Sequence, residues 1–216
     1  SYGTLGVIAD VSLKVLPRPE DEQTIRLSLA LADARKLVLS YRRQVNPVSG
    51  ICYVDGQLML RLSGTAISVA RAMATLGGET SSNEFWLDVD NHKLASFRAA
   101  RAVWRLSTHP HEAIGEDKFA MMDWGFAQRW LLDPEVDPRI GYQGKGHWTL
   151  YQKPIDDVTG EIFSEINGSA MDRPEIAHPA IFHPVSDTQM TLQQNIKKVF
   201  DPGGIFNPGR MYRGIY

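Results

Sequence analysis

A two-residue turn in the first third of the chain constrains the fold more than any other feature. Asp55 and Gly56 separate two segments rich in apolar residues, Ser49 to Val54 and Gln57 to Leu62. This dipeptide readily adopts the positive φ angles of a type I′ turn, the geometry that joins two antiparallel strands directly. The sequence therefore predicts a β-hairpin and, with it, an antiparallel sheet.

Helical and strand-like segments flank this hairpin in a regular order. Predicted strands alternate apolar and polar residues, whereas predicted helices repeat apolar residues every three or four positions. Gly77 and Gly78 supply a left-handed stop after the second helix. Besides the hairpin, we expect a strand at Gln23 to Leu29, a helix at Asp33 to Arg43, a helix at Ala66 to Leu76 and a fourth strand at Arg101 to Thr108. The order β-α-β-β-α-β is that of a split βαβ unit, an α+β fold with helices on one face of an antiparallel sheet.

The remainder of the chain is expected to extend this sheet and to close with a helix. Two segments rich in Pro, Gly and Asp, Asp133 to Gly146 and Asp156 to Pro184, are interpreted as long loops. Ser186 and Gln189 have the spacing of a capping box, which predicts the start of the last helix. The other expected elements are a helix at Glu84 to Phe97 and strands at Phe119 to Trp124, Phe126 to Leu132 and His147 to Gln152.

A proline-rich segment near the start indicates a domain boundary. Leu5 to Leu16 is rich in β-branched residues and predicts a strand, which Pro17-Arg18-Pro19-Glu20 ends because each proline fixes its own φ and restricts the residue before it. We predict a remnant of another domain with its linker at 1–20, a sheet domain at 21–200 and a C-terminal return segment at 201–216. Because the chain enters a strand almost at once, we expect it to be the later part of a longer protein.

The composition disfavours several classes of function. A formal net charge of −2, with basic residues dispersed along the chain, gives no attraction for nucleic acid. No run of about eighteen apolar residues encodes a transmembrane helix. The single cysteine, Cys52, cannot form an internal disulfide and suits a reducing compartment. It lies in a predicted strand, where a buried and inert thiol is favoured over a nucleophile.

The start of the chain carries a motif of a flavoprotein family. Its first eight residues, Ser-Tyr-Gly-Thr-Leu-Gly-Val-Ile, resemble the Gly-x-x-Gly-Thr-Leu-Gly-Val/Ile segment of FAD-linked oxidases of the vanillyl-alcohol-oxidase type, without the family's leading glycine. In that family the glycines let the backbone approach the dinucleotide, and main-chain N–H groups satisfy its phosphate and adenine acceptors. The cofactor-binding positions implied by this resemblance are Gly3, Thr4, Gly6, Val7 and Ile8.

The end of the chain resembles the same family. Val199 to Arg210 is similar to the Asp-Pro-x-Gly-Ile-x-Asn-Pro-Gly segment that closes many of these oxidases and packs beside the flavin domain. This resemblance implies a further cofactor-binding position at Asn207, for which a purely structural role is equally open. Five segments between the ends resemble the ferredoxin-like cap domain of the FAD-binding subunits of glycolate oxidases: Leu60 to Ala66, Leu76 to Glu79, Trp104 to Ser107, Asp123 to Gly125 and Arg129 to Trp130.

The resemblance implies an FAD-dependent oxidoreductase subunit that oxidises a 2-hydroxy acid such as glycolate. Its implied partners are a second flavoprotein subunit and an iron–sulfur subunit, to which the electrons pass. It also implies a cytoplasmic protein associated with the inner membrane through its complex. The chain alone is expected to be inactive and to lack FAD, and the sequence assigns no catalytic base. The alternative is a non-catalytic interaction module that holds the catalytic flavin subunit. Related 2-hydroxy-acid dehydrogenases carry paired histidines in the cap domain, and the lack of a matching pair here favours this alternative, whereas the FAD-type motifs at the two ends oppose it.

Three other patterns contain residues that can bind ligands. His109-Pro110-His111-Glu112 has a spacing that can chelate zinc, but its proline and loop context favour an exposed polar turn, and no metal site is predicted. The glycine-rich segment Gly141 to Gly146 lacks the strand-then-helix context of a phosphate loop and is interpreted as a hairpin. Arg105, Arg129 and Trp124 are candidate ligand contacts if they face the flavin side.

Overall fold

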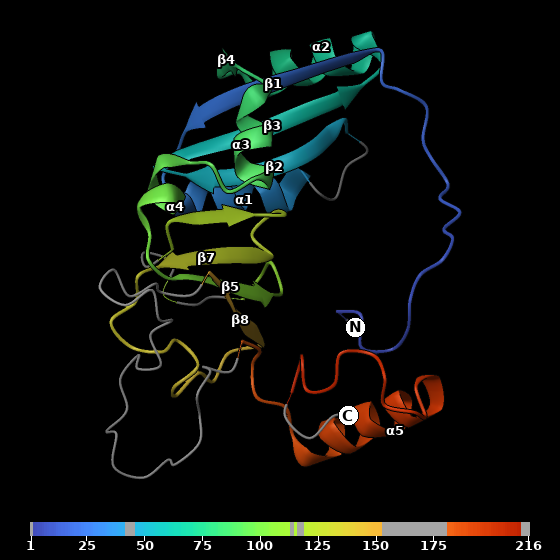
Figure 1. Cartoon of the computed structure of the whole chain (residues 1–216). Helices are drawn as coiled ribbons and strands as arrows, with labels where there is room; N and C mark the ends of the chain where they lie inside the picture. The colour runs from blue at the N-terminus through green and yellow to red at the C-terminus, as the bar shows by residue number, and fades with distance from the viewer. Residues whose placement is uncertain (1, 42–45, 113–114, 116–118, 153–180, 213–216) are drawn as a thin grey trace.

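A computed structural model describes residues 2–41, 46–112, 115, 119–152 and 181–212 (Figure 1). These residues form eight strands and five helices. The strands are β1 (Asp21–Ser28), β2 (Val48–Val54), β3 (Gln57–Gly64), β4 (Glu79–Ser81), β5 (Val103–Thr108), β6 (Met121–Asp123), β7 (Gln128–Leu132) and β8 (Gly146–Gln152). The helices are α1 (Leu31–Tyr41), α2 (Ala66–Leu76), α3 (Glu84–Asp90), α4 (Ala95–Ala99) and α5 (Asp187–Phe200).

All eight strands join one antiparallel sheet in the order β4-β1-β3-β2-β6-β7-β5-β8. The predicted hairpin is confirmed, because Val54 pairs with Gln57 across a turn in which Asp55 and Gly56 have φ angles of 50° and 72°. The order β4-β1-β3-β2 is that of a split βαβ unit, and β6, β7, β5 and β8 extend it beyond β2. The predicted α+β class is therefore confirmed.

The fourth strand of the split unit is not the predicted one. β4 takes this place at the sheet edge beside β1, whereas the segment predicted for it forms β5 in the other half of the sheet. Gly78 accounts for the sharp return after α2: its φ is 90°, and a Cβ there would lie 2.6 Å from the carbonyl oxygen of Arg26. A strand of three residues is too short to show a period of two, so the alternation in the sequence could not reveal it.

Helices cover both faces of the sheet, whereas the sequence predicted helices on one face. The longer helices α1 and α2 lie on the predicted face, where Ala34 and Val69 pack in one apolar cluster with Ile25 and Leu60 of the sheet. The short helices α3 and α4, predicted as one helix, pack on the opposite face, which lies toward the viewer in Figure 1. Trp86 of α3 anchors this second layer by donating a hydrogen bond from Nε1 to the hydroxyl of Thr24 in β1, at 2.9 Å.

The segment predicted as a strand at Leu5 to Leu16 forms no strand here. It runs as an extended link between the two ends of the molecule in Figure 1, and its apolar side chains from Val7 onward are exposed, with Val7 at 79% and Leu16 at 86%. A strand needs a hydrogen-bonding neighbour, and no described segment pairs with it. The domain boundary predicted at Pro17 to Glu20 stays a prediction.

Candidate functional site

The two ends of the chain meet in one unit built around α5. Ser186 caps the helix with the predicted capping box, because its hydroxyl accepts a hydrogen bond from the backbone N–H of Gln189 while the Gln189 side chain accepts one from the backbone N–H of Ser186. Beyond α5, the chain turns back past its own first residues (Figure 1). Both segments with flavoprotein motifs therefore lie in this unit, away from most of the sheet.

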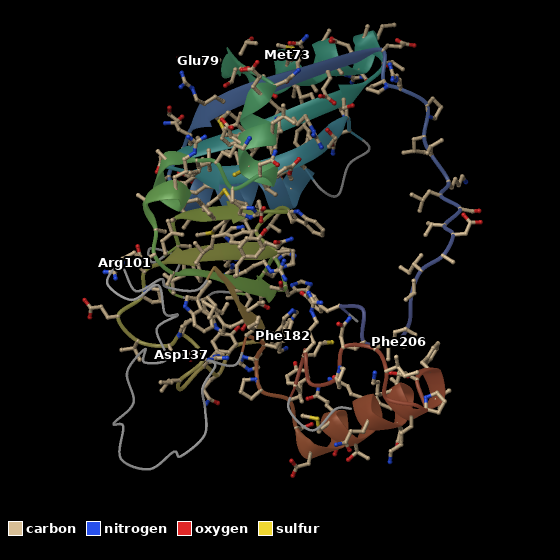
Figure 2. The ribbon with its side chains drawn as sticks, in the orientation of Figure 1. Met73, Glu79, Arg101, Asp137, Phe182 and Phe206 are labelled. Carbon is tan, nitrogen blue, oxygen red and sulfur yellow. The ribbon has the colours of Figure 1, made fainter. Side chains whose placement is uncertain are left out.

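A buried lysine holds these segments together. The Lys197 side chain on α5 is 2% exposed, and its ammonium donates hydrogen bonds to the carbonyl oxygens of Thr4 at 2.6 Å and Phe206 at 2.8 Å. Its third partner is the carboxylate of Asp201, one turn further along. A lysine ammonium has three N–H donors, so all three are satisfied by groups from three segments of the chain. In Figure 2, Phe206 lies in this unit, at the opposite end of the molecule from Glu79.

Asp201 organises the loop that follows α5. Its carboxylate accepts hydrogen bonds from the backbone N–H groups of Ile205 at 3.0 Å and Phe206 at 2.8 Å. The hydrogen bond from Lys197, with these two, lowers the pKa of Asp201 to about 2, against the opposing effect of burial. The loop carrying the Asn207 motif is therefore fixed from inside by an ionised carboxylate.

The structure brings three of the six predicted cofactor-binding residues together. Asn207 donates a hydrogen bond from Nδ2 to the carbonyl oxygen of Gly3 at 3.0 Å. Gly3 has a φ of 75°, and a Cβ there would lie 2.9 Å from Asn207 Nδ2, so both conformation and space favour glycine. Thr4 is buried, and its carbonyl oxygen is the one that Lys197 binds.

The other three predicted residues, Gly6, Val7 and Ile8, lie on the extended segment. Val7 and Ile8 are exposed, and the backbone N–H groups of all three form no hydrogen bond with the described residues. Unpaired backbone donors beside a compact turn suit the phosphate and adenine acceptors of a dinucleotide. These residues fit one edge of an FAD site, and whether they bind it stays a prediction.

An aromatic contact connects the terminal unit to the sheet. The Phe182 ring lies between Tyr2 and Tyr212, with ring centroids 4.9 Å and 5.8 Å apart. The carbonyl oxygen of Phe182 accepts a hydrogen bond from Arg139, whose guanidinium lies 4.9 Å from the ring centroid of Trp104 in β5. The terminal unit thus contacts the face of β5 that also bears Leu106 and packs with Trp148.

The candidate ligand contacts Arg105 and Arg129 lie on opposite faces of the sheet. Arg105 pairs with Trp130, whereas Arg129 is the next residue along β7 and pairs with Leu106. Arg129 is fully buried and donates hydrogen bonds from Nε and one terminal amino group to the carbonyl oxygens of Phe126 and Glu112, which indicates a structural role for these two groups. The two arginines therefore cannot bind the same ligand.

A second site, of which the sequence predicted only Trp124 as a ligand contact, is a cleft on the α3 face of the sheet. It measures about 350 Å³ and includes Arg61, Trp86, Asp123 and Trp124 in its lining. Burial, opposed by the hydrogen bond from Trp130 Nε1, raises the pKa of Asp123 to about 6. Burial and the nearby Asp123 also raise the pKa of the Cys52 thiol, in line with its interpretation as inert. The sequence marks Asp123 only as part of a segment that resembles the family, and it does not reveal that the side chain is buried, because this burial depends on strand pairing.

The histidine segment offers no further ligand cluster. His109 and His111 stack with ring centroids 5.1 Å apart, and the carboxylate of Glu112 accepts a hydrogen bond from the backbone of Lys145 at 3.3 Å. Among the residues that the structure describes, no group of three His, Cys, Asp or Glu side chains could hold a metal ion. In the same residues, no helix is long and apolar enough to cross a membrane.

Comparison with known proteins identifies a relative. The chain is 35% identical over 217 residues to glycolate oxidase subunit GlcE of Escherichia coli (strain K12). The chain is homologous to this subunit. The match covers 98% of the chain and 55% of GlcE, so the chain spans about half the length of its relative. No protein-family model matches the chain, and no solved structure is similar to it.

Proposed function

We propose that this chain is the C-terminal, cap-bearing part of an FAD-dependent subunit that oxidises a 2-hydroxy acid, with glycolate as the preferred substrate. Its homology to GlcE supports this assignment over nearly the whole chain. The observation that carries it is the hydrogen bond between Asn207 and Gly3, because two motifs from opposite ends of the sequence meet at one place. A purely local role for each motif would not require that meeting.

In this proposal the extended backbone of Gly6 to Ile8 forms one edge of the FAD site, and Asn207 orients the turn at Gly3. Bound FAD supplies the redox chemistry by accepting the electrons of the substrate. The residues of the chain hold the backbone donors in position, and we assign no catalytic base. The electrons pass to a second flavoprotein subunit and an iron–sulfur subunit, which place the complex in the cytoplasm at the inner membrane.

A second candidate function is a non-catalytic interaction module within the same complex. The exposed apolar side chains of α5 favour it: Leu192, Val199 and Phe200 are each more than half exposed. Apolar side chains on one helix face are typical of a surface that another protein segment covers. In this case the chain would position the catalytic flavoprotein without contributing a redox cofactor.

Purification of the full-length subunit without its partners distinguishes the two functions. A flavoenzyme subunit should be yellow, and glycolate should bleach its flavin absorbance under anaerobic conditions. The Asn207→Ala variant should lose flavin, whereas Asn195→Ala, on an exposed position of α5, should retain it. A colourless full-length subunit that still assembles with its partners would support the interaction module instead.

A further inference from the structure

The cleft on the α3 face is built around a glycine within a strand. Gly50 of β2 pairs with Arg61 of β3, and a Cβ at Gly50 would lie 3.1 Å from both the Arg61 Cβ and the Trp86 ring. The missing side chain therefore lets the indole of α3 lie close to the sheet. Beside it, the end of β6 contributes Asp123 and Trp124 to the lining of the cleft. Four segments that are distant in sequence thus enclose one space of about 350 Å³.

The guanidinium of Arg61 is fixed in this cleft with its terminal amino groups unused. Its Nε donates a hydrogen bond to the hydroxyl of Ser49 at 3.1 Å, and its Cζ lies 5.3 Å from the centroid of the Trp86 ring. In the described residues, the two terminal amino groups have no hydrogen-bond partner and Arg61 forms no salt bridge. A guanidinium held by its Nε and by an aromatic face is preorganised to bind a carboxylate through its free edge.

Asp123 lines the same cleft without neutralising Arg61. The side chain is 8% exposed and accepts a hydrogen bond from Trp130 Nε1 at 3.3 Å, and it forms no ion pair with a described residue. The charged groups that act on it are Arg105 of β5 and Asp90 at the end of α3. Because burial favours its protonated form below about pH 6, Asp123 then adds no negative charge to the cleft.

The Trp124 side chain forms an apolar lip of the cleft on an unusual turn. Trp124, Gly125 and Phe126 have consecutive φ angles of 51°, 64° and 71°. A bulky residue rarely adopts a positive φ, and such strain concentrates at functional positions. The turn leaves the Trp124 side chain 73% exposed, whereas Phe126 points into the core and is 1% exposed. The chain thus holds a flat apolar surface in solvent beside a carboxylate-binding group.

We propose that this cleft binds a carboxylate ligand with a planar, apolar body, through the guanidinium of Arg61 and the indole of Trp124. The carboxylate forms paired hydrogen bonds with the free edge of Arg61, and the planar body packs on the Trp124 ring. A two-carbon acid such as glycolate has too little apolar surface to use that ring, so this site is distinct from the proposed substrate site. The proposal requires no flavin and does not depend on the proposed function.

Calorimetry on the purified chain tests this site with benzoate as the probe. Benzoate should bind saturably, and benzamide, which has the same ring without the charge, should bind at least about ten-fold more weakly. Arg61→Gln and Trp124→Ala should each weaken benzoate binding by about ten-fold. The matched control is Arg26→Gln. Arg26 of β1 lies on the same face of the sheet as Arg61, but it is already paired with Glu79. Its benzoate affinity should be unchanged.

The pH dependence of benzoate binding provides a second test of this site. Benzoate should bind more tightly at about pH 5 than at about pH 7.5, because ionised Asp123 repels the carboxylate, and Asp123→Asn should remove this difference. If Arg61→Gln does not fold by far-ultraviolet circular dichroism, the exposed Trp124→Ala variant and the benzamide comparison decide the outcome. The proposal is wrong if benzoate does not saturate, if benzamide or glycolate binds equally well, or if a folded Arg61→Gln variant binds like the unmodified chain.

Discussion

The side chain of Asn207 donates a hydrogen bond to the backbone carbonyl of Gly3, 204 positions earlier in the sequence. Lys197 of α5 donates a hydrogen bond to the backbone carbonyl of Thr4, the residue that follows Gly3. The ends of the chain therefore form one unit, and the eight-stranded sheet lies between them in sequence. Bringing together residues that are so far apart in the sequence costs loop-closure entropy. Several buried hydrogen bonds in the terminal unit together offset this cost.

Removing the ammonium of Lys197 should release the terminal unit while leaving the sheet folded. In Lys197→Met, the carbonyls of Thr4 and Phe206 lose a donor, and Asp201 is left buried without its cation. The backbone amides of Ile205 and Phe206 should then exchange hydrogen about ten-fold faster or more, as measured by NMR. Lys198→Met is the matched control, since its side chain is exposed on the same helix. Equal protection in both variants would contradict this role of Lys197.

Neutralising Asp123 should stabilise the sheet at neutral pH. Its pKa is about 6 in the folded chain and has an ordinary value of 3.8, so the folded state binds the proton more tightly. Stability should therefore fall as pH rises from about 4 to about 6, and Asp123→Asn should recover roughly 1–3 kcal/mol above pH 6. Urea unfolding at several pH values measures this. The prediction fails if the variant is less stable than the unmodified chain at neutral pH and equally pH-dependent.

The isolated chain should fold without flavin. Its apolar clusters consist of sheet and helix residues, such as Ile25, Val69, Trp86 and Trp130, and include no residue of the two flavoprotein motifs. Far-ultraviolet circular dichroism should therefore show helix and strand with a cooperative thermal transition. A featureless spectrum, or ordering only after FAD is added, would show that the sheet depends on the cofactor.

The sequence predicts this fold well where the signals are local. The Asp55-Gly56 turn, the helices α1 and α2 and the capping box at Ser186 are each specified by residues within one turn or one helix. The prediction from sequence fails where the position of an element depends on a contact between residues that are distant in the sequence. β4 needs Gly78 close to β1, and α3 lies on the unexpected face because Trp86 bonds to Thr24, 62 residues earlier.

The candidate sites, like the fold, could be predicted only where their signals are local. The motifs at Gly3 and Asn207 could be found in the sequence because they resemble a family pattern, but their contact could not. Lys197 and Asp201 left only a weak signal, an i, i+4 pair at a helix end before Pro202. Asp123 and Arg61 lie in one cleft only because three strands and a helix pack in a particular order.

Limited proteolysis should cut the extended segment before any strand. Lys14 lies in this segment, which has no regular structure, whereas Arg26 lies in β1 between β3 and β4. Trypsin should therefore cleave after Lys14 well before Arg26, and not after Arg18, because Pro19 follows it. Lys14→Gln is the control and should delay cleavage of the segment. Early cleavage inside β1 would place the domain boundary elsewhere.

The chain should bind FAD weakly or not at all. Only one edge of the proposed site lies in it: the turn at Gly3, the extended backbone of Gly6 to Ile8 and the side chain of Asn207. The extended segment forms no strand, so binding must order it at a cost on the order of 1–2 kcal/mol per residue. A few backbone hydrogen bonds, each contributing about 1 kcal/mol net, do not offset that cost.

Calorimetric titration of FAD into the purified chain measures this affinity, and ADP as a second titrant separates binding at the dinucleotide phosphates from binding at the flavin ring. We expect no saturation by either titrant in the micromolar range, and identical behaviour of the chain and its Asn207→Ala variant. Micromolar or tighter binding that Asn207→Ala weakens would instead mean that the meeting of the two ends already builds a complete site. In that case the remaining part of a longer subunit would not be needed to hold the cofactor.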